Sequence, residues 1–228
     1  MRGYPLLKST HPFGHEFSGV IAAVGEGVMR FAEGDRVAVH NSAPCGSCHW
    51  CKHGQFFMCD DLLFNRGSYA EYVRVPARIV SQNMFKLPDS MSHKTASLME
   101  SFACAVCGIV NCPIEPGDFV VINGAGPIDM WQTSCHMARK GGFVLLFGGT
   151  KAGSMFSVDA TRLHYSQLTV KGVFHTTTLA VKQAFKLLEL GVIDERDFIQ
   201  NEYRLADLEA ALLEHASGEV IKNCIVYE

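Results

Sequence analysis

The feature that most constrains this chain is a cluster of four cysteines in the spacing C-x2-C-x2-C-x7-C. They are Cys45, Cys48, Cys51 and Cys59. A structural zinc ion takes four ligands in a tetrahedron, with sulfur about 2.3 Å from the metal, and short spacers let one loop supply them all. The alternative is a set of four unrelated buried or free cysteines, but clustered cysteines without an export signal favour a metal. The spacing therefore predicts a closed, structural zinc lobe.

Composition and charge exclude several classes of partner. The chain has 228 residues, of which 48% are hydrophobic, enough for one large domain or two small ones. Its formal net charge is −3, with both signs mixed, which argues against a nucleic acid or an anionic membrane as partner. The apolar runs are too short to span a bilayer, and the first residues lack the apolar core of a signal peptide. We therefore expect a cytoplasmic protein that binds neither a membrane nor a nucleic acid.

Short apolar segments separated by glycines dominate the first part of the chain and predict a barrel or sandwich of strands. Such segments fill residues 14–40, and residues 68–80 are expected to return to strand. The cysteines lie in an excursion over residues 41–66. Ser92 is placed to cap a helix that extends to about Val110, because apolar residues recur there at helical spacing.

The second half of the sequence predicts a small parallel sheet with helices. Strands are expected at residues 119–123, 143–147 and 168–175, and helices at residues 130–139, 179–190 and 205–216. A last strand is expected over residues 220–227. The first of these strands leads into a glycine turn and then a helix, the context in which a dinucleotide fingerprint becomes credible.

Several motifs occur in an order that identifies a family resemblance. They are GHEFSGV (14–20), GDRV (34–37), GSYAEY (67–72), LMES (98–101) and PGDFVVINGAGP (116–127). With the cysteine lobe, they resemble the zinc-containing medium-chain dehydrogenases, near the sorbitol and threonine dehydrogenase branch. The resemblance covers nearly the whole chain and implies an α/β fold. A GroES-like β-barrel with its zinc lobe would occupy residues 1–112, a contracted Rossmann-like parallel-sheet domain residues 113–192, and a segment returning to the first domain residues 193–228.

The resemblance also implies a catalytic zinc site, for which three residues are present. His15 matches the family's histidine ligand, Glu16 the adjacent glutamate, and Glu100 the glutamate of the polyol branch. Without the family pattern, His15 is an ordinary surface or core histidine and Glu100 a solvent-facing residue of its helix. The family's first zinc ligand is a cysteine, and no cysteine precedes Cys45 in this sequence. A carboxylate in place of that thiolate makes a harder site that binds zinc less tightly.

A nicotinamide cofactor, NAD or NADP, is expected at the glycine turn formed by Gly124, Ala125, Gly126 and Pro127. In the fingerprint G-x-G-x-x-G the glycines allow close approach of a pyrophosphate, but Asp129 stands at the third glycine position. Its carboxylate is expected to cap the helix and to substitute for the phosphate. No acidic residue between Met130 and Val158 is available for the ribose, and the family's middle βα units have no counterpart. We therefore expect weak cofactor binding.

Two functions of different classes remain open from sequence. The first is a zinc-dependent oxidoreductase that moves hydride between a nicotinamide cofactor and a secondary alcohol or polyol, the substrate that Glu100 and residues 162–165 suggest by resemblance. The second is a contracted, non-enzymatic remnant, a zinc-stapled fold that forms homo-oligomers through exposed strand edges. A third explanation is that the sequence joins segments of a longer enzyme, in which case the intact mass differs from 25.1 kDa.

Overall fold

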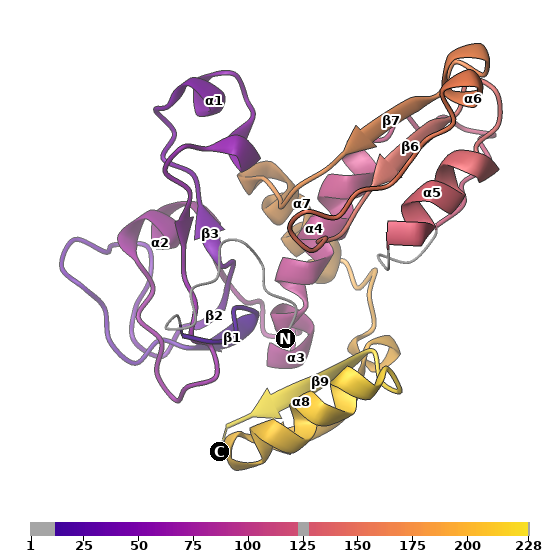
Figure 1. The fold of residues 1–228 in the computed structure, drawn as a ribbon. Helices are drawn as coiled ribbons and strands as arrows, with labels where there is room; N and C mark the ends of the chain where they lie inside the picture. Colours follow the sequence, from indigo (N-terminus) through magenta and orange to yellow (C-terminus); the bar gives the residue numbers. More distant parts are fainter. Residues whose placement is uncertain (1–11, 123–127, 228) are drawn as a thin grey trace. The chain divides into compact units, whose positions relative to one another are not determined.

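The computed structural model describes residues 12–122 and 128–227, and Figure 1 shows the order of the elements. These residues fall into two compact units. One contains residues 12–106 and 176–227, and the other contains residues 107–175. Among the helices described, none has both the length and the apolar character needed to cross a bilayer.

A three-stranded antiparallel sheet lies at the centre of the first unit. Its strands are β1 (Phe17–Val20), β2 (Arg36–Val39) and β5 (Met84–Lys86), with β2 in the middle. Phe17 pairs with Val39, which pairs in turn with Met84. The buried core around the sheet consists of Phe31, Val37, Val39, Ala43, Ile79 and Met84. The strands expected within residues 14–40 are confirmed.

The strand expected over residues 68–80 is wrong. Its first nine residues hold no regular element, and α2 (Ala77–Asn83) follows them. Pro76 precedes this helix with φ −62°, the value that its ring imposes and that a helix start accepts. At the other end, Asn83 is buried and donates from Nδ2 to the Ser42 carbonyl at 2.6 Å. The apolar residues of this segment fit both periods, and packing of the helical face decides between them.

The cysteine lobe extends from the sheet as a short, self-contained excursion (Figure 1). At its base β3 (Ser42–Ala43) pairs antiparallel with β4 (Leu63–Phe64). Between these strands lie the helix α1 (His49–Lys52) and the 3-10 turn η1 (Phe56–Met58). The excursion expected over residues 41–66 is therefore present.

The long helix expected after Ser92 is divided into two segments, α3 (His93–Ser97) and α4 (Met99–Val110). Ser92 caps α3 as expected, because its Oγ accepts a hydrogen bond from the Thr95 N–H at 2.9 Å. Leu98 separates the segments with ψ −8°, which departs from α-helical geometry.

The second unit contains a two-stranded parallel sheet. Its elements are α5 (Ile128–Met137), β6 (Phe143–Leu146), α6 (Ala160–Tyr165) and β7 (Thr169–Gly172). Val144 of β6 pairs with Val170 of β7, and α6 forms part of the crossover between the strands. Arg162 fixes the end of α5, because its guanidinium donates to the carbonyls of Cys135, His136 and Ala138.

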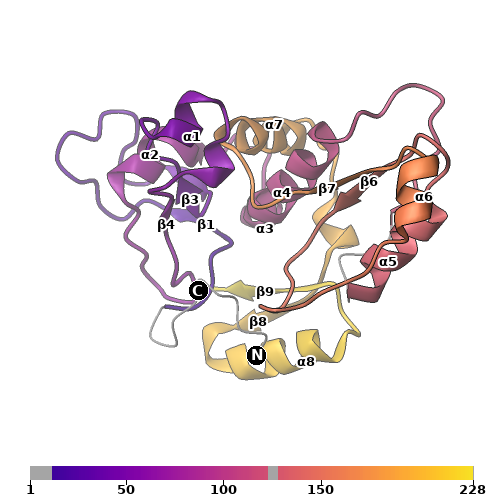
Figure 2. The same ribbon diagram turned by 45° about the horizontal axis from the view of Figure 1, so that its top comes forward.

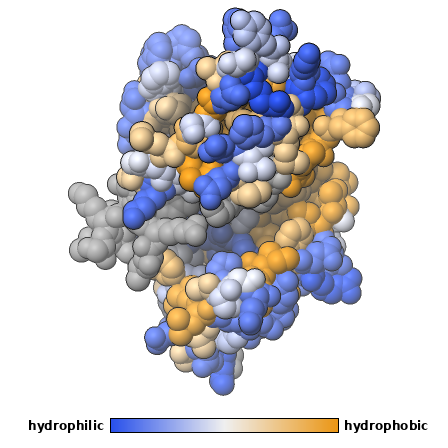
Figure 3. Space-filling view, turned by 45° about the vertical axis from the view of Figure 1, so that its right-hand side comes forward, coloured by the Kyte–Doolittle hydropathy of each residue, from blue (hydrophilic) through white to orange (hydrophobic). Residues whose placement is uncertain are grey.

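The third parallel strand, expected over residues 119–123, is not formed in its described part. Residues 119–122 have no strand partner and are exposed, Phe119 to 98% and Ile122 to 88%. An apolar segment forms a strand when neighbouring strands and helices bury it, and the described part of this unit does not bury this one. Figure 3 shows apolar side chains among polar ones on one face of the molecule.

The cap expected at Asp129 is not formed by that residue. Asp129 lies one residue inside α5, in its first turn, rather than at the position before the helix.

The chain after residue 175 completes the first unit. The amphipathic α7 (Thr178–Glu189) confirms the helix expected at residues 179–190, with Ala180, Val181, Ala184, Phe185 and Leu188 buried. The 3-10 turns η2 (Glu195–Asp197) and η3 (Leu205–Asp207) flank β8 (Ile199–Arg204), a strand that the sequence pattern did not predict.

The last elements form a compact β-α-β arrangement with β8. They are α8 (Leu208–Ser217) and β9 (Lys222–Val226), and β9 pairs parallel to β8. Figure 2 shows α8 alongside the two strands. Gly218 ends α8 in the left-handed conformation, φ 81°, as expected for a helix that stops at this glycine.

Candidate functional site

The four predicted zinc cysteines converge on one point. The sulfur atoms of Cys45, Cys48, Cys51 and Cys59 all lie within 4.8 Å of one another, and Cys45 Sγ is 4.0 Å from Cys51 Sγ. Four sulfurs placed 2.3 Å from a tetrahedral zinc are about 3.8 Å apart. The observed spacing fits that geometry, so the lobe has the donor set and the dimensions for one zinc ion.

Backbone N–H groups of the lobe also point at two of its sulfur atoms and favour a negative charge there. The backbone N–H groups of Ser47 and Cys48 point to Cys45 Sγ at 3.4 and 3.3 Å, and the Cys45 N–H points to Cys59 Sγ at 3.2 Å. The donors on Ser47, and next the Cys48 N–H, lower the pKa of Cys45 to about 6. Burial has the opposite effect and raises the pKa of Cys51 to about 12. A buried thiolate requires a positive partner, which a zinc ion supplies.

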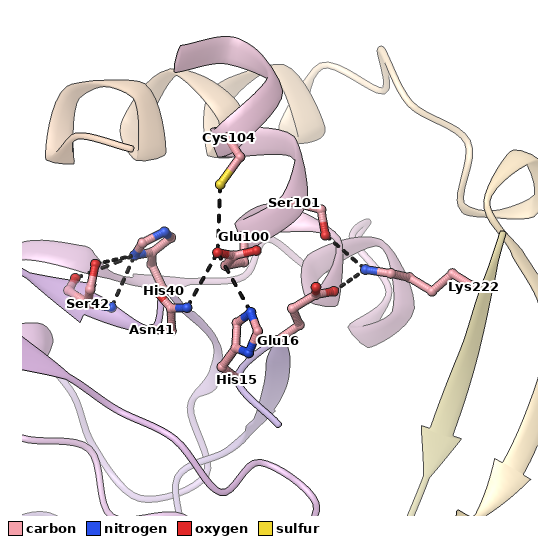
Figure 4. A network of polar contacts seen from close by, with 9 residues as sticks. All are labelled: His15, Glu16, His40, Asn41, Ser42, Glu100, Ser101, Cys104 and Lys222. Atoms are coloured by element: carbon pink, nitrogen blue, oxygen red, sulfur yellow. Dashed lines mark hydrogen bonds and ion pairs between the residues drawn. The ribbon is translucent and has the colours of Figure 1, made fainter. Parts of the chain in front are cut away.

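The second predicted group, His15, Glu16 and Glu100, also converges. One ligand atom from each residue lies within 4.8 Å of the others. His15 and Glu16 immediately precede β1, and Glu100 lies in the first turn of α4, so residues far apart in sequence meet here (Figure 4). His15 Nε2 is 4.0 Å from Glu100 Oε1. Imidazole and carboxylate are ordinary zinc ligands, and this set leaves room for a further ligand.

Glu100 is the buried member of this group. It is 8% exposed, and burial raises the pKa of its carboxyl group, a shift that the nearby His15 opposes. Its Oε1 accepts a hydrogen bond from Asn41 Nδ2 at 3.4 Å, and the Cys104 thiol lies 3.7 Å away. The Asn41 contact is longer than a typical N–H···O hydrogen bond, and the Cys104 thiol is a weak donor at a distance ordinary for sulfur.

Glu16 has a different partner, which sequence reasoning missed. Lys222 Nζ contacts Glu16 Oε2 and donates to Ser101 Oγ at 2.9 Å (Figure 4). Lys222 comes from β9, more than two hundred residues along the chain, and no local sequence signal marks it. Cys104 has such a signal, because it lies four residues after Glu100 and shares its helix face. Asn41 has none.

The predicted cofactor residues Gly124, Ala125, Gly126 and Pro127 lie outside the described residues. Residues 162–165, which suggested a polyol substrate, lie in α6. There the Arg162 guanidinium donates hydrogen bonds to backbone carbonyls at the end of α5.

Comparison with known proteins identifies the relatives of this chain. Residues 1–89 match the family model described as the alcohol dehydrogenase GroES-like domain. The sorbitol dehydrogenase of Bacillus subtilis (strain 168) is 33% identical over 138 residues, which are 58% of this chain and 38% of the relative. The D-xylulose reductase A of Aspergillus oryzae is also 33% identical, over 60% of this chain and 38% of the relative. The chain thus spans well under two thirds of the curated relatives that it matches.

The fold is shared with solved structures as well. A cobalt- and zinc-bound thermostable alcohol dehydrogenase from Pyrobaculum aerophilum matches with a TM-score of 0.76 at 24% identity, over 93% of this chain and 81% of that one. The partial sheets observed here are consistent with a contracted form of that α/β fold.

Proposed function

This chain is related to the zinc-containing alcohol and polyol dehydrogenases, and from that relationship we propose that it is a zinc-dependent oxidoreductase. The reaction is hydride transfer between a secondary alcohol or polyol and a nicotinamide cofactor, NAD or NADP. The observation that carries the proposal is the convergence of His15, Glu16 and Glu100 from the start of β1 and the first turn of α4. A structural zinc in the four-cysteine lobe belongs to the same proposal.

The donor set of the second centre fits a zinc ion. When bound, zinc acts as a Lewis acid on the oxygen of an alcohol and lowers its pKa. His15 and Glu100 would hold the ion, and the burial of Glu100 keeps water away from one side of it. His15 is half exposed, at 49% of its side chain, so the other side is accessible to a small molecule.

The proposed substrate class rests on the relatives. The two proteins compared above are named for sorbitol and D-xylulose, both small polyhydroxylated molecules. A polyol offers several hydroxyl groups, and the charged side chains of Glu16 and Lys222 border the centre and can accept or donate hydrogen bonds to them.

The test is NADH or NADPH production from sorbitol and xylitol by the zinc-loaded chain. His15→Ala should abolish turnover, because it removes a ligand of the centre. His215→Ala, which changes an exposed histidine of α8, is the matched control and should keep it. Turnover that is equal in wild type and His15→Ala would contradict the proposal.

A second candidate is a non-enzymatic remnant, a zinc-stapled fold that associates with copies of itself. The exposed apolar residues 119–122 favour it, because the family's cofactor sheet needs this segment as a strand. Under this candidate the four-cysteine lobe binds zinc, but neither polyol turnover nor cofactor binding is measurable, and the chain associates in solution.

A further inference from the structure

Among the described residues, only long contacts compensate the burial of the Glu100 carboxylate. It is 8% exposed, and its neighbours Asn41 Nδ2, Cys104 Sγ and His15 Nε2 lie 3.4, 3.7 and 4.0 Å from Oε1. A buried carboxylate is costly unless a charge or short hydrogen bonds stabilise it. Beside it, Asn41 is 5% exposed, and its Oδ1 has no hydrogen-bond partner among the described residues. The long contacts of Glu100 point to a cation-binding centre rather than to a closed polar network.

Glu16 is poorly placed to stabilise such a cation. Its carboxylate contacts the Lys222 ammonium group, which also donates to Ser101 Oγ. Lys222 engages one Glu16 oxygen, so a metal on the other oxygen would lie close to the ammonium group, a second positive charge. Glu16 therefore serves better as the anchor of Lys222 than as a ligand.

We propose that Cys104 is a thiolate ligand of this centre and completes it with His15 and Glu100. The inference rests on the proposed function, since it concerns the same centre. Cys104 follows Glu100 by four residues on α4, so both side chains project from one helix face. Zinc-binding helices of the H-E-x-x-H type use the same spacing for two ligands of one ion.

The distance between these two side chains supports the assignment. Tetrahedral zinc with bonds of about 2.3 Å to sulfur and about 2.0 Å to oxygen separates the two ligand atoms by about 3.5 Å. The observed distance between Cys104 Sγ and Glu100 Oε1 is 3.7 Å. Figure 4 shows the thiol directed at the carboxylate. Cys104 lies outside the three-residue group of ligand atoms within 4.8 Å, so binding draws its sulfur inward and releases its proton to water.

This ligand set gives the centre one nitrogen, one oxygen and one sulfur donor. A thiolate makes the site softer and favours zinc and cobalt over magnesium or calcium. The four-cysteine lobe and this centre would then differ in sulfur content, which makes them separable by spectroscopy.

The experiment uses the full chain loaded first with one equivalent of zinc, which fills the four-cysteine lobe, and then titrated with cobalt(II). Wild type should bind one cobalt ion with a near-ultraviolet sulfur-to-cobalt charge-transfer band. Cys104→Ser and Cys104→Ala should lose that band and bind cobalt more than about tenfold more weakly. His15→Ala should lose it too, which assigns the band to this centre and not to the lobe. Cys112→Ser, which changes another half-buried thiol, is the matched control and should retain it.

The outcomes distinguish the role of Cys104 as a ligand from the existence of the metal centre itself. Cobalt binding without a charge-transfer band in wild type, or an unchanged band in both Cys104 variants, would overturn the role of Cys104 while leaving the metal centre intact. No cobalt binding beyond the lobe in wild type would overturn the centre itself, and with it the proposed function. Circular dichroism of each variant verifies that the loss of a band does not reflect unfolding.

Discussion

Individual thiols of the four-cysteine lobe differ in their readiness to bind zinc. Hydrogen bonds from Ser47 lower the pKa of Cys45 to about 6, whereas burial raises the pKa of Cys51 to about 12 and also raises the pKa of Cys59. At neutral pH the metal-free lobe therefore holds thiolate at Cys45 and protonated thiols at Cys51 and Cys59. Zinc binds thiolates, so these two protons must leave when the metal enters.

We expect zinc binding to the lobe near pH 7 to release protons, those of Cys51 and Cys59 among them, and zinc affinity to fall as the pH is lowered because protons compete for the sulfurs. Calorimetric titration of the metal-free chain in buffers of different ionisation enthalpy measures the number of protons released per zinc ion. A heat of binding that is independent of the buffer would contradict the pKa differences described here.

His93 links three elements as a neutral imidazole. Its Nδ1 is 2.7 Å from Ser18 Oγ in β1, and its Nε2 accepts a hydrogen bond from Arg36 Nε in β2 at 3.3 Å. Burial, and next the charge of Arg36, lower its pKa below the ordinary value of 6.5. The folded chain thus resists protonation at this position, while the unfolded chain does not.

The sign of the effect follows from linkage. The neutral His93 imidazole stabilises the folded chain fully above pH 6.5, the ordinary pKa. This contribution is lost as the pH falls from there through the lower pKa of His93 in the folded chain. We expect the midpoint of urea unfolding to decrease between about pH 7.5 and about pH 5.5, and His93→Gln to reduce this pH dependence. His215→Ala, at an exposed position, should leave the slope unchanged. An identical slope in His93→Gln would refute this role.

At the scale of elements, the sequence predicts best where one local signal dominates. The cysteine spacing predicted the lobe, Ser92 predicted the start of α3, and the apolar stripe predicted α7. Prediction from sequence failed for segments whose secondary structure depends on packing against distant parts of the chain. Residues 68–80 suit either period, and packing makes their end the helix α2. Residues 119–122 are apolar enough for a strand but lack strand partners in the described structure.

The candidate site shows the same limit. The motif resemblance alone identifies His15, Glu16 and Glu100 as one group of candidate ligands. Lys222 could not be found in this way, because its contact with Glu16 depends on how β9 returns to the first unit. Asn41 likewise becomes relevant only through its distance to Glu100.

One side chain of α8 contacts both strands of the β8-α8-β9 arrangement. Glu214 accepts hydrogen bonds from Asn201 and Tyr203 on β8 at 3.0 Å and from Asn223 on β9 at 2.8 Å. Donation by Asn223, and next by Asn201, lowers the pKa of Glu214.

We expect Glu214→Ala to destabilise the chain, because three donors lose one acceptor, and to make β8 and β9 exchange amide protons faster. Glu209→Ala, at an exposed position of the same helix, is the control. Hydrogen exchange followed by mass spectrometry is the measurement, and unchanged protection of both strands in Glu214→Ala would argue against this role.

For the molecule as a whole, the two units differ in how completely they match the proposed function. The unit with His15 and Glu100 contains both candidate metal centres. The other unit has two parallel strands in its described part, whereas one mononucleotide-binding half of the family's fold has three.

We therefore expect this chain to bind NADH weakly, without saturation at micromolar concentrations, so that turnover requires a high cofactor concentration. Calorimetric titration with NADH tests this expectation. A dissociation constant of about 1 μM, which corresponds to about −8.2 kcal/mol, would show that the sheet is sufficient for tight binding.

The most direct test of the central claim, two metal centres in the first unit, is the number of zinc ions per chain. Elemental analysis of freshly purified protein should give about two for wild type and about one for His15→Ala, since that variant retains only the four-cysteine lobe. Cys48→Ser should lose the lobe's zinc and unfold at a lower temperature. A value near one for wild type, unchanged by His15→Ala, would contradict a metal centre at His15 and Glu100 and would leave the zinc-stapled remnant as the better account.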